Sequence, residues 1–173
     1  MCPLWLLFFI SMLLYHGSNT TVNKPQLIEQ TRGLDFGSGF YVTTSEEQAI
    51  RFSEIVFKRK KTGSAIVNVY QFDMAAAENA LVIKKFNSAD IEWLRFVAEN
   101  RLKTYKGSEY DMVIGAVAND TLMPTIQAYF SGFINEEAAL ITLKASKLVD
   151  QICLKSKKAL SLLCFVREYQ PNG

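Results

Sequence analysis

Alternating stretches of apolar and polar residues divide the chain into short strands and helices. Runs rich in Val, Ile and aromatic residues between turn residues predict strands, and apolar residues spaced three and four apart predict helices. The predicted strands cover residues 13–16, 65–72, 81–86, 110–117, 151–154 and 164–168. The predicted helices cover residues 46–60, 89–105, 124–130, 135–146 and 156–163. Because helices and strands do not alternate strictly, the pattern favours a mixed α+β fold over a doubly wound sheet.

Polar residues at the predicted helix starts support these boundaries. Ser45 and Gln48 form a capping-box pattern, in which the serine oxygen accepts from first-turn amides and the glutamine reaches back. Ser88 is expected to cap the second helix, and Pro124 suits the first turn of the third. The basic run at residues 58–61 is expected to be a solvated helix end, where positive charge suits the helix dipole; the alternative is a basic strip that faces a nucleic-acid acceptor. The residues expected on the buried faces of the first two helices are Ala49, Phe52, Val56, Ile91, Leu94, Val97, Ala98 and Leu102.

The apolar run at residues 3–14 contains one polar residue, Ser11. It is shorter than the roughly 20 residues that span a bilayer, and it lacks the basic residue and small cleavage-site residues of a signal peptide. Two interpretations stay open: residues 1–11 are sequence upstream of a start at Met12, or they form an apolar leader. We expect one folded domain over residues 12–170, because no linker or repeat divides the rest. We expect a cytoplasmic protein, secreted or membrane-tethered only if the leader is genuine.

Composition narrows the classes of function. The 173 residues are 49% apolar, enough for one packed core, and a net charge of +2 is too small for a strongly electropositive nucleic-acid binder. Cys2, Cys153 and Cys164 have no metal-type spacing, so we expect neither a zinc module nor a disulfide framework, and we interpret the last two as small core residues. The single histidine, His16, excludes any mechanism that needs two imidazoles.

Small polar residues stand out at three places, two of them at predicted strands and one just before the first predicted helix. These are residues 14–18 (LYHGS), 35–41 (DFGSGFY) and 150–152 (DQI). The first ends a strand with a histidine and a glycine, which lets a ligand approach the backbone closely. The sequence has no Walker loop, dinucleotide glycine fingerprint, zinc-protease helix or serine elbow. The three places are therefore the candidates for chemistry.

Together these segments resemble the ADP-ribosyltransferase fold of the diphtheria-toxin and poly(ADP-ribose) polymerase type. From Met12 onward the chain is most similar to a prokaryotic family of that superfamily, formerly catalogued as a domain of unknown function. Five motifs carry the resemblance, in this order: YHGS, DFGSGFY-TT, YDMVIGAVAND, TIQAYFSG and DQI. The resemblance implies a split mixed β-sheet core flanked by helices.

The resemblance also implies an NAD site at the first two motifs. It assigns His16 to a ribose hydroxyl, the backbone of Gly17 to the nicotinamide carboxamide, and Ser18 to the same cofactor site. It places the Tyr41 ring against the nicotinamide and Gln48 near the carboxamide. Without the resemblance, each residue also has an ordinary structural role. His16 could be half-buried and hydrogen-bonded to the backbone, and Gly17 could be a turn residue. Tyr41 could be a core aromatic residue, and Gln48 could serve only the capping box.

Gln151 departs from the pattern of the superfamily. A glutamate usually stands there, where it binds the ribose 2′-hydroxyl and stabilises the oxocarbenium-like charge that grows as the glycosidic bond breaks. Glutamine keeps the acceptor oxygen and loses the charge. Asp120, after the strand at 110–117, is the one strand-end carboxylate proposed as a replacement acid or base, with helix capping as its alternative role. The candidate catalytic residues are Gln151, Tyr41 and Asp120.

Two classes of function follow from the resemblance. The first is an NAD-dependent mono-ADP-ribosyltransferase, a glycosyltransferase that cleaves the nicotinamide–ribose bond and transfers ADP-ribose to a protein or nucleic-acid acceptor. The second is a binding module of the same fold for NAD, ADP-ribose or a partner. A toxin-like protein of this kind leaves room for a neutralising partner protein, and we expect neither a metal nor a membrane span.

Overall fold

The described part of the chain folds into short helices and strands. The computed structural model describes residues 11–27, 33–118, 123–144 and 149–171. The strands are β1 (Ser11–Ser18), β2 (Phe40–Val42), β3 (Ile66–Asp73), β4 (Ile83–Lys85), β5 (Met112–Ala116), β6 (Asp150–Leu154) and β7 (Leu163–Tyr169). The helices are α1 (Glu46–Lys60), α2 (Met74–Ala80), α3 (Ile91–Leu102), α4 (Met123–Phe130), α5 (Glu136–Lys144) and α6 (Lys157–Leu160).

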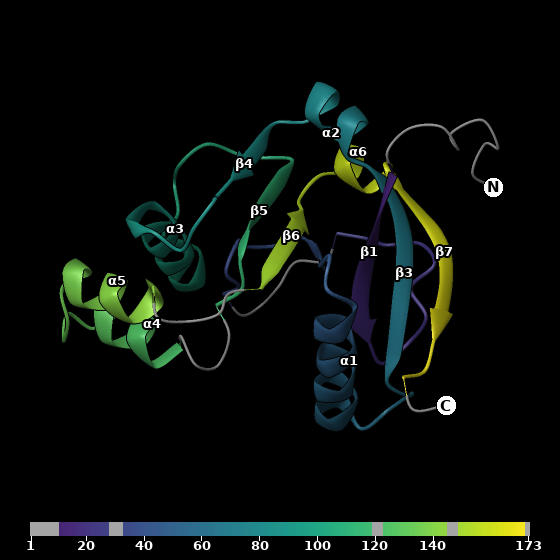
Figure 1. Cartoon of the computed structure of the whole chain (residues 1–173), viewed down its shortest axis with the longest axis horizontal. Helices are drawn as coiled ribbons and strands as arrows, with labels where there is room; N and C mark the ends of the chain where they lie inside the picture. Colours follow the sequence, from purple (N-terminus) through teal and green to yellow (C-terminus); the bar gives the residue numbers. More distant parts are fainter. Residues whose placement is uncertain (1–10, 28–32, 119–122, 145–148, 172–173) are drawn as a thin grey trace.

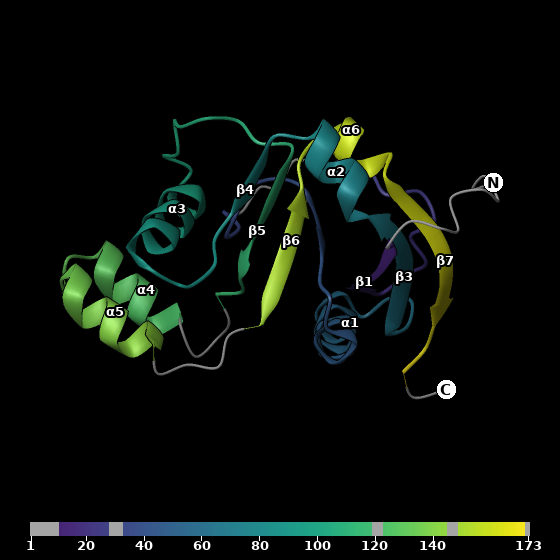
Figure 2. The same ribbon diagram turned by 45° about the horizontal axis from the view of Figure 1, so that its top comes forward.

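The strands form two sheets that lie side by side (Figure 1). One has the order β1-β3-β7 and is antiparallel throughout. The other has the order β2-β6-β5-β4, in which β4 and β5 are parallel and the other neighbours are antiparallel. The turned view keeps α3, α4 and α5 beyond the second sheet, on the side away from the first (Figure 2). This arrangement confirms the predicted mixed α+β class.

A two-bond β-bridge joins the two sheets. The amide of Tyr15 in β1 donates to the carbonyl of Thr43, just after β2, at 2.9 Å, and the Thr43 amide donates back at 3.0 Å. On their other sides, β1 pairs with β3 and β2 pairs with β6. The bridge therefore places β1, β2 and β6 next to one another, which brings the first, second and last sequence motifs together.

Two main hydrophobic clusters pack against the second sheet and the junction. In one, the fully buried Trp93 of α3 donates its indole N–H to the Ala116 carbonyl at 3.1 Å. The other is built around Leu14 and neighbouring aromatic residues. The adjacent Phe40 and Tyr41 pack into different clusters, Phe40 into the second and Tyr41 against the first. The two side chains therefore lie on opposite faces of β2.

Helix α1 packs very closely on β1. A Cβ atom placed on Gly17 would lie 2.2 Å from the Ala49 carbonyl oxygen and 2.6 Å from the Ser53 amide nitrogen. Small residues of α1 therefore face the strand, and Phe52 is 43% exposed. The prediction that Phe52 is buried was wrong because periodicity does not report how near a helix approaches. Leu102, at the end of α3, is likewise 57% exposed.

The helix caps agree with the sequence in part. Ser45 Oγ accepts from the Gln48 amide at 3.2 Å, which confirms the predicted start of α1. The cap of α3 is Asp90, whose Oδ1 accepts from the Trp93 amide at 3.0 Å. The predicted cap, Ser88, instead hydrogen-bonds to Asp90 Oδ2 at 3.2 Å. A carboxylate two residues later displaces the serine because it accepts more strongly from backbone amides.

One helix and one cysteine differ from the sequence prediction. Helix α2 was not predicted; Asp73 caps it by accepting from the Ala76 amide at 2.9 Å. Cys153 is a buried free thiol, as expected, but Cys164 is disulfide-bonded, so its interpretation as a small core residue was wrong. The search for a membrane-spanning helix, made over the described residues, finds none of sufficient length and apolarity.

The contact between α1 and β1 predicts that Gly17→Ala destabilises the fold. Backbone atoms of α1 occupy the space for the new methyl group, so the helix must move, at a cost of about 2 kcal/mol. Urea denaturation should show this loss. Ser11→Ala, at an exposed position on the same strand, should change the free energy of unfolding by less than about 0.5 kcal/mol. Equal stability of the two variants would contradict the close packing.

Candidate functional site

Strands β1 and β2 diverge directly after the bridge that joins them. In a regular antiparallel ladder the bridged pair Tyr15 and Thr43 would be followed, two residues on, by a hydrogen-bonded pair of Gly17 and Tyr41. That pair does not form. The carbonyl of Tyr41 accepts instead from Nδ1 of the His16 side chain, at 2.7 Å. We call the place where the strand pairing stops, at His16, Gly17 and Tyr41, the β1–β2 split.

The split leaves backbone hydrogen-bonding groups without a strand partner. Because both backbone groups of Tyr15 point toward β2, those of Gly17 point the same way by the two-residue period of the strand. By the same rule, the amide of Tyr41 points toward β1, as the groups of Thr43 do. Within the described residues, no backbone bond outside the regular elements uses these groups. The Gly17 edge thus offers one donor and one acceptor side by side.

His16 is held in one tautomer. Its Nδ1 lies 2.7 Å from a carbonyl oxygen, so Nδ1 carries the proton and Nε2 is an acceptor in the neutral ring. The ring also packs on Phe40, with centroids 4.4 Å apart. His16 is half-buried. Removal of its ring from water lowers its pKa, the bond to the Tyr41 carbonyl opposes this shift, and the charge of Lys60 adds a smaller lowering. The imidazole is therefore neutral at pH 7, with Nε2 as its acceptor.

Gln48 has an unused side-chain oxygen. The capping box predicts that this amide bonds back to the Ser45 N–H, but that N–H donates to Thr43 Oγ1 at 3.0 Å. Gln48 Oε1 is buried and makes no hydrogen bond within the described residues. A buried acceptor without a partner costs stability, which makes it a candidate for ligand contact. Gln48 lies next to Ala49, whose carbonyl borders Gly17.

The Tyr41 hydroxyl is hydrogen-bonded to the loop that precedes β2. It donates to the Gly37 carbonyl at 2.6 Å and accepts from the Phe36 amide at 3.1 Å. Burial raises the pKa of Tyr41 well above its usual range, with a further rise from the nearby Cys153 thiol, so the phenol stays protonated. These bonds fix the ring and the loop relative to each other.

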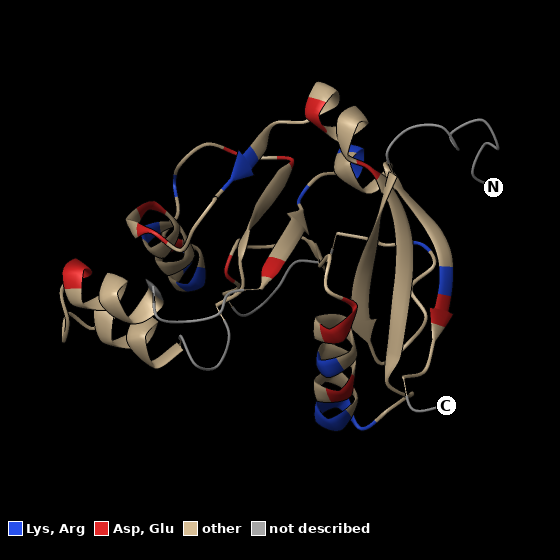
Figure 3. Ribbon diagram, in the orientation of Figure 1, with Lys and Arg blue, Asp and Glu red and all other residues tan. Residues whose placement is uncertain are grey.

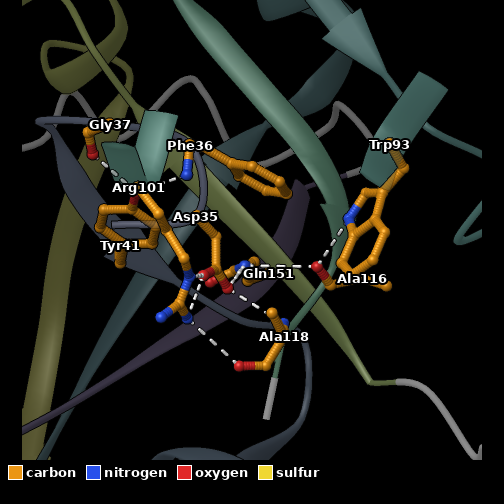
Figure 4. Close-up of polar contacts among 9 residues, drawn as sticks. All are labelled: Asp35, Phe36, Gly37, Tyr41, Trp93, Arg101, Ala116, Ala118 and Gln151. Atoms are coloured by element: carbon orange, nitrogen blue, oxygen red, sulfur yellow. Dashed lines mark hydrogen bonds and ion pairs between the residues drawn. The ribbon is translucent and has the colours of Figure 1, made fainter. Parts of the chain in front are cut away.

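Gln151 belongs to a buried polar cluster with Asp35 and Arg101, drawn in Figure 4. Its Nε2 donates to Asp35 Oδ2 at 2.8 Å and to the Ala116 carbonyl at 3.3 Å. Asp35 Oδ1 accepts from Arg101 Nε at 2.6 Å, within an ion pair, and Asp35 Oδ2 accepts from the Ala118 amide at 3.0 Å. Asp35 is 6% exposed and Gln151 is 8% exposed. The carboxylate thus has partners at both oxygens.

The strand register relates this cluster to the split. Gln151 is two residues from Cys153 on β6, and Cys153 is opposite Tyr41, so both side chains lie on the Tyr41 face of the sheet. Gly17 lies on the same face as Tyr15, opposite Thr43, which is two residues from Tyr41. The structure thus brings Gly17, Tyr41 and Gln151 to one face across three neighbouring strands.

The other predicted residues are less informative. Ser18 ends β1 and is 8% exposed, next to the Gly17 edge. Asp120 lies outside the described residues. Asp150 accepts from the Thr44 hydroxyl at 2.7 Å, away from the Gln151 cluster. Among the described residues, no group of three His, Cys, Asp or Glu side chains could hold a metal ion.

Sequence reasoning missed Asp35 and Arg101 as site residues. Asp35 was noted only as the first residue of its motif. Arg101 belongs to the last turn of α3, where a basic residue ordinarily suits the helix dipole. The available signal was the acidic residue directly before an aromatic-glycine motif, but nothing in the sequence links it to Gln151, which is 116 positions away.

The fold and the split define an α+β protein with two bridged sheets and an opened strand pair. Residues 12–165 match the family described as Protein of unknown function (DUF3990), and the chain belongs to that family. No curated protein matches the chain, and no solved structure does.

Burial of neutral His16 predicts a pH effect on stability. A histidine whose folded pKa lies below its unfolded value of 6.5 binds fewer protons when folded. Its contribution to stability is therefore complete above pH 6.5 and is lost as the pH falls toward the lower, folded pKa. The His16→Asn variant keeps a donor near the Nδ1 position and cannot titrate. Between pH 7.5 and about 5.5, the melting temperature of the wild type should fall more than that of the variant; equal falls would contradict the burial of a neutral ring.

Proposed function

We propose that this protein binds NAD at the β1–β2 split and acts as a mono-ADP-ribosyltransferase. It would cleave the bond between nicotinamide and ribose and transfer ADP-ribose to a protein or nucleic-acid acceptor. The observation that carries the proposal is the interrupted strand pairing, which leaves the amide and carbonyl of Gly17 directed toward β2 without a strand partner. The sequence resemblance to ADP-ribosyltransferases supports it independently.

The Gly17 edge matches a primary carboxamide, the group that nicotinamide carries. The Gly17 N–H can donate to the carboxamide oxygen while its C=O accepts from the carboxamide nitrogen. The unpartnered Gln48 Oε1 offers a further acceptor for the second amide hydrogen. Backbone recognition of this kind needs no large positive field, in agreement with a net charge of +2.

His16 would hold the sugar end of the same ligand. Its Nε2 is an acceptor in the tautomer that the Tyr41 carbonyl selects, and a ribose hydroxyl is a suitable donor. Lys60 lies close enough for its charge to affect the pKa of His16. It belongs to the basic last turn of α1, the end of that helix coloured blue in Figure 3. This turn would supply positive charge for the pyrophosphate of NAD.

The reaction would proceed mainly by positioning. The C1′–N bond breaks with its electron pair going to nicotinamide, and the acceptor attacks C1′ and releases its proton to solvent. Holding both partners in line removes much of the entropy cost of this encounter. Gln151 Oε1 would accept from the ribose 2′-hydroxyl, and its neutral amide stabilises the growing positive charge less than a carboxylate would.

A second function is a binding module for NAD or ADP-ribose that does not turn its ligand over. The observation that favours it is the neutral residue at position 151, whose Nε2 is bonded to Asp35 at 2.8 Å. The two functions share the split and differ only in the chemical step.

Titration of the purified protein with NAD, followed for binding and for nicotinamide release, tests both functions. The transferase should bind NAD, release nicotinamide and label an acceptor in lysate. Binding without release would favour the binding module. Neither binding nor release would overturn both.

The His16→Asn variant tests the role of the split in NAD binding. It keeps the bond to the Tyr41 carbonyl and removes Nε2, so the NAD dissociation constant should rise about 3- to 10-fold, as for one lost hydrogen bond. Asn79→Ala, on the exposed surface of α2, is the control and should leave the constant unchanged. Equal affinity of the wild type and His16→Asn would remove His16 from the site. Gly17→Ala is unsuitable here, because its effect on folding would mask any effect on binding.

A further inference from the structure

The buried cluster on β6 fixes the orientation of the Gln151 amide. Nε2 lies 2.8 Å from a carboxylate oxygen and 3.3 Å from the Ala116 carbonyl oxygen. Both partners are acceptors only, so the side of the amide that faces them must be the NH₂ group. The carbonyl oxygen Oε1 is therefore directed away from Asp35. A residue with two possible amide orientations is restricted to one.

The same contacts explain why a glutamate does not fit at this position. A carboxylate in place of the Gln151 amide would meet the Asp35 carboxylate and the Ala116 carbonyl, with an acceptor facing an acceptor at both contacts. Arg101 is the cation paired with Asp35 among the described residues, and it already balances one negative charge. A second buried carboxylate would have no partner, which is strongly destabilising.

We propose that Asp35 is the positioning residue of this site and that it requires a hydrogen-bond donor at position 151. Asp35 carries the buried negative charge, Arg101 balances it, and Gln151 donates to it. The absence of the glutamate typical of the superfamily is thus a consequence of Asp35. The catalytic part of this inference rests on the proposed function, whereas the structural part does not.

Asp35 also affects how strongly Gln151 can bind a ligand hydroxyl. Donation from Nε2 to a carboxylate in a buried site polarises the amide and makes Oε1 a stronger acceptor. Asp35 would therefore supply, through Gln151, part of the electrostatic effect that a glutamate supplies directly. It acts without touching the ligand.

A charge exchange between the two positions tests the structural part. Gln151→Glu should lower the melting temperature by about 10 °C, because it buries an unpaired charge. Asp35→Asn should also lower it, because Arg101 loses its partner. In the double variant the carboxylate and the amide exchange places, so the melting temperature should lie above that of Gln151→Glu. Recovery of the melting temperature is expected to be partial. The Ala118 amide still donates toward position 35, and the Ala116 carbonyl still needs a donor at position 151.

Two controls separate charge from general disruption. Asp150→Asn removes a neighbouring carboxylate outside the cluster, and combining it with Gln151→Glu should give no recovery. Gln151→Leu loses the donors without adding charge, so it should cost less stability than Gln151→Glu; soluble yield gives this comparison even if the glutamate variant does not fold. The inference is overturned if Gln151→Leu is the worse of the two, or if the double variant is no more stable than Gln151→Glu.

NAD turnover tests the positioning role. Below its melting temperature, Asp35→Asn should reduce kcat for nicotinamide release at least 10-fold while the NAD dissociation constant stays within threefold of the wild type. A purely structural role would not separate the two constants. Unchanged kcat in Asp35→Asn would overturn the positioning role. If the wild type releases no nicotinamide, the proposed transferase fails, and the melting temperatures still decide whether Asp35 selects glutamine.

Discussion

The two hydrogen bonds between Tyr15 and Thr43 are the constraint on which the rest of the structure depends. They are the backbone bridge between the two sheets in the described residues, and they set the register of β1 against β2. Without this register, the His16 ring would not face the Tyr41 carbonyl, and the backbone groups of Gly17 would not be directed toward the end of β2. One bridge is enough because α1 packs on β1 on one side and β6 pairs with β2 on the other.

The split and the buried cluster are linked through β2 and the loop before it. The Tyr41 carbonyl accepts a hydrogen bond from the His16 side chain, and the Tyr41 hydroxyl donates one to the loop that contains Asp35. Asp35 in turn orients Gln151 on β6. A backbone edge prepared for a ligand and a side chain prepared for the chemical step are therefore parts of one hydrogen-bonded arrangement. The low mobility expected of such an arrangement suits a mechanism that works by positioning.

Much of the fold could be predicted from local pattern. The start of α1, for example, followed from the capping pattern at Ser45. Phe52 could not be assigned correctly, because its exposure depends on how closely α1 approaches Gly17. Of the candidate site, the sequence indicated the residues that lie in the recognised motifs, such as His16 and Gln151, and missed the roles of Asp35 and Arg101. Arg101 carried no signal, since a basic residue at a helix end has an ordinary local explanation.

The sequence by itself determined the α+β class, most element boundaries and the three short motifs, because these depend on periodicity and turn chemistry within a few residues. Only the tertiary structure decided where β1 and β2 part and which residue Gln151 faces. Both depend on contacts between segments distant in the chain, 25 residues for His16 and Tyr41 and 116 for Asp35 and Gln151. Hydrogen bonds over such separations form when packing brings the strands together, and no local pattern specifies them.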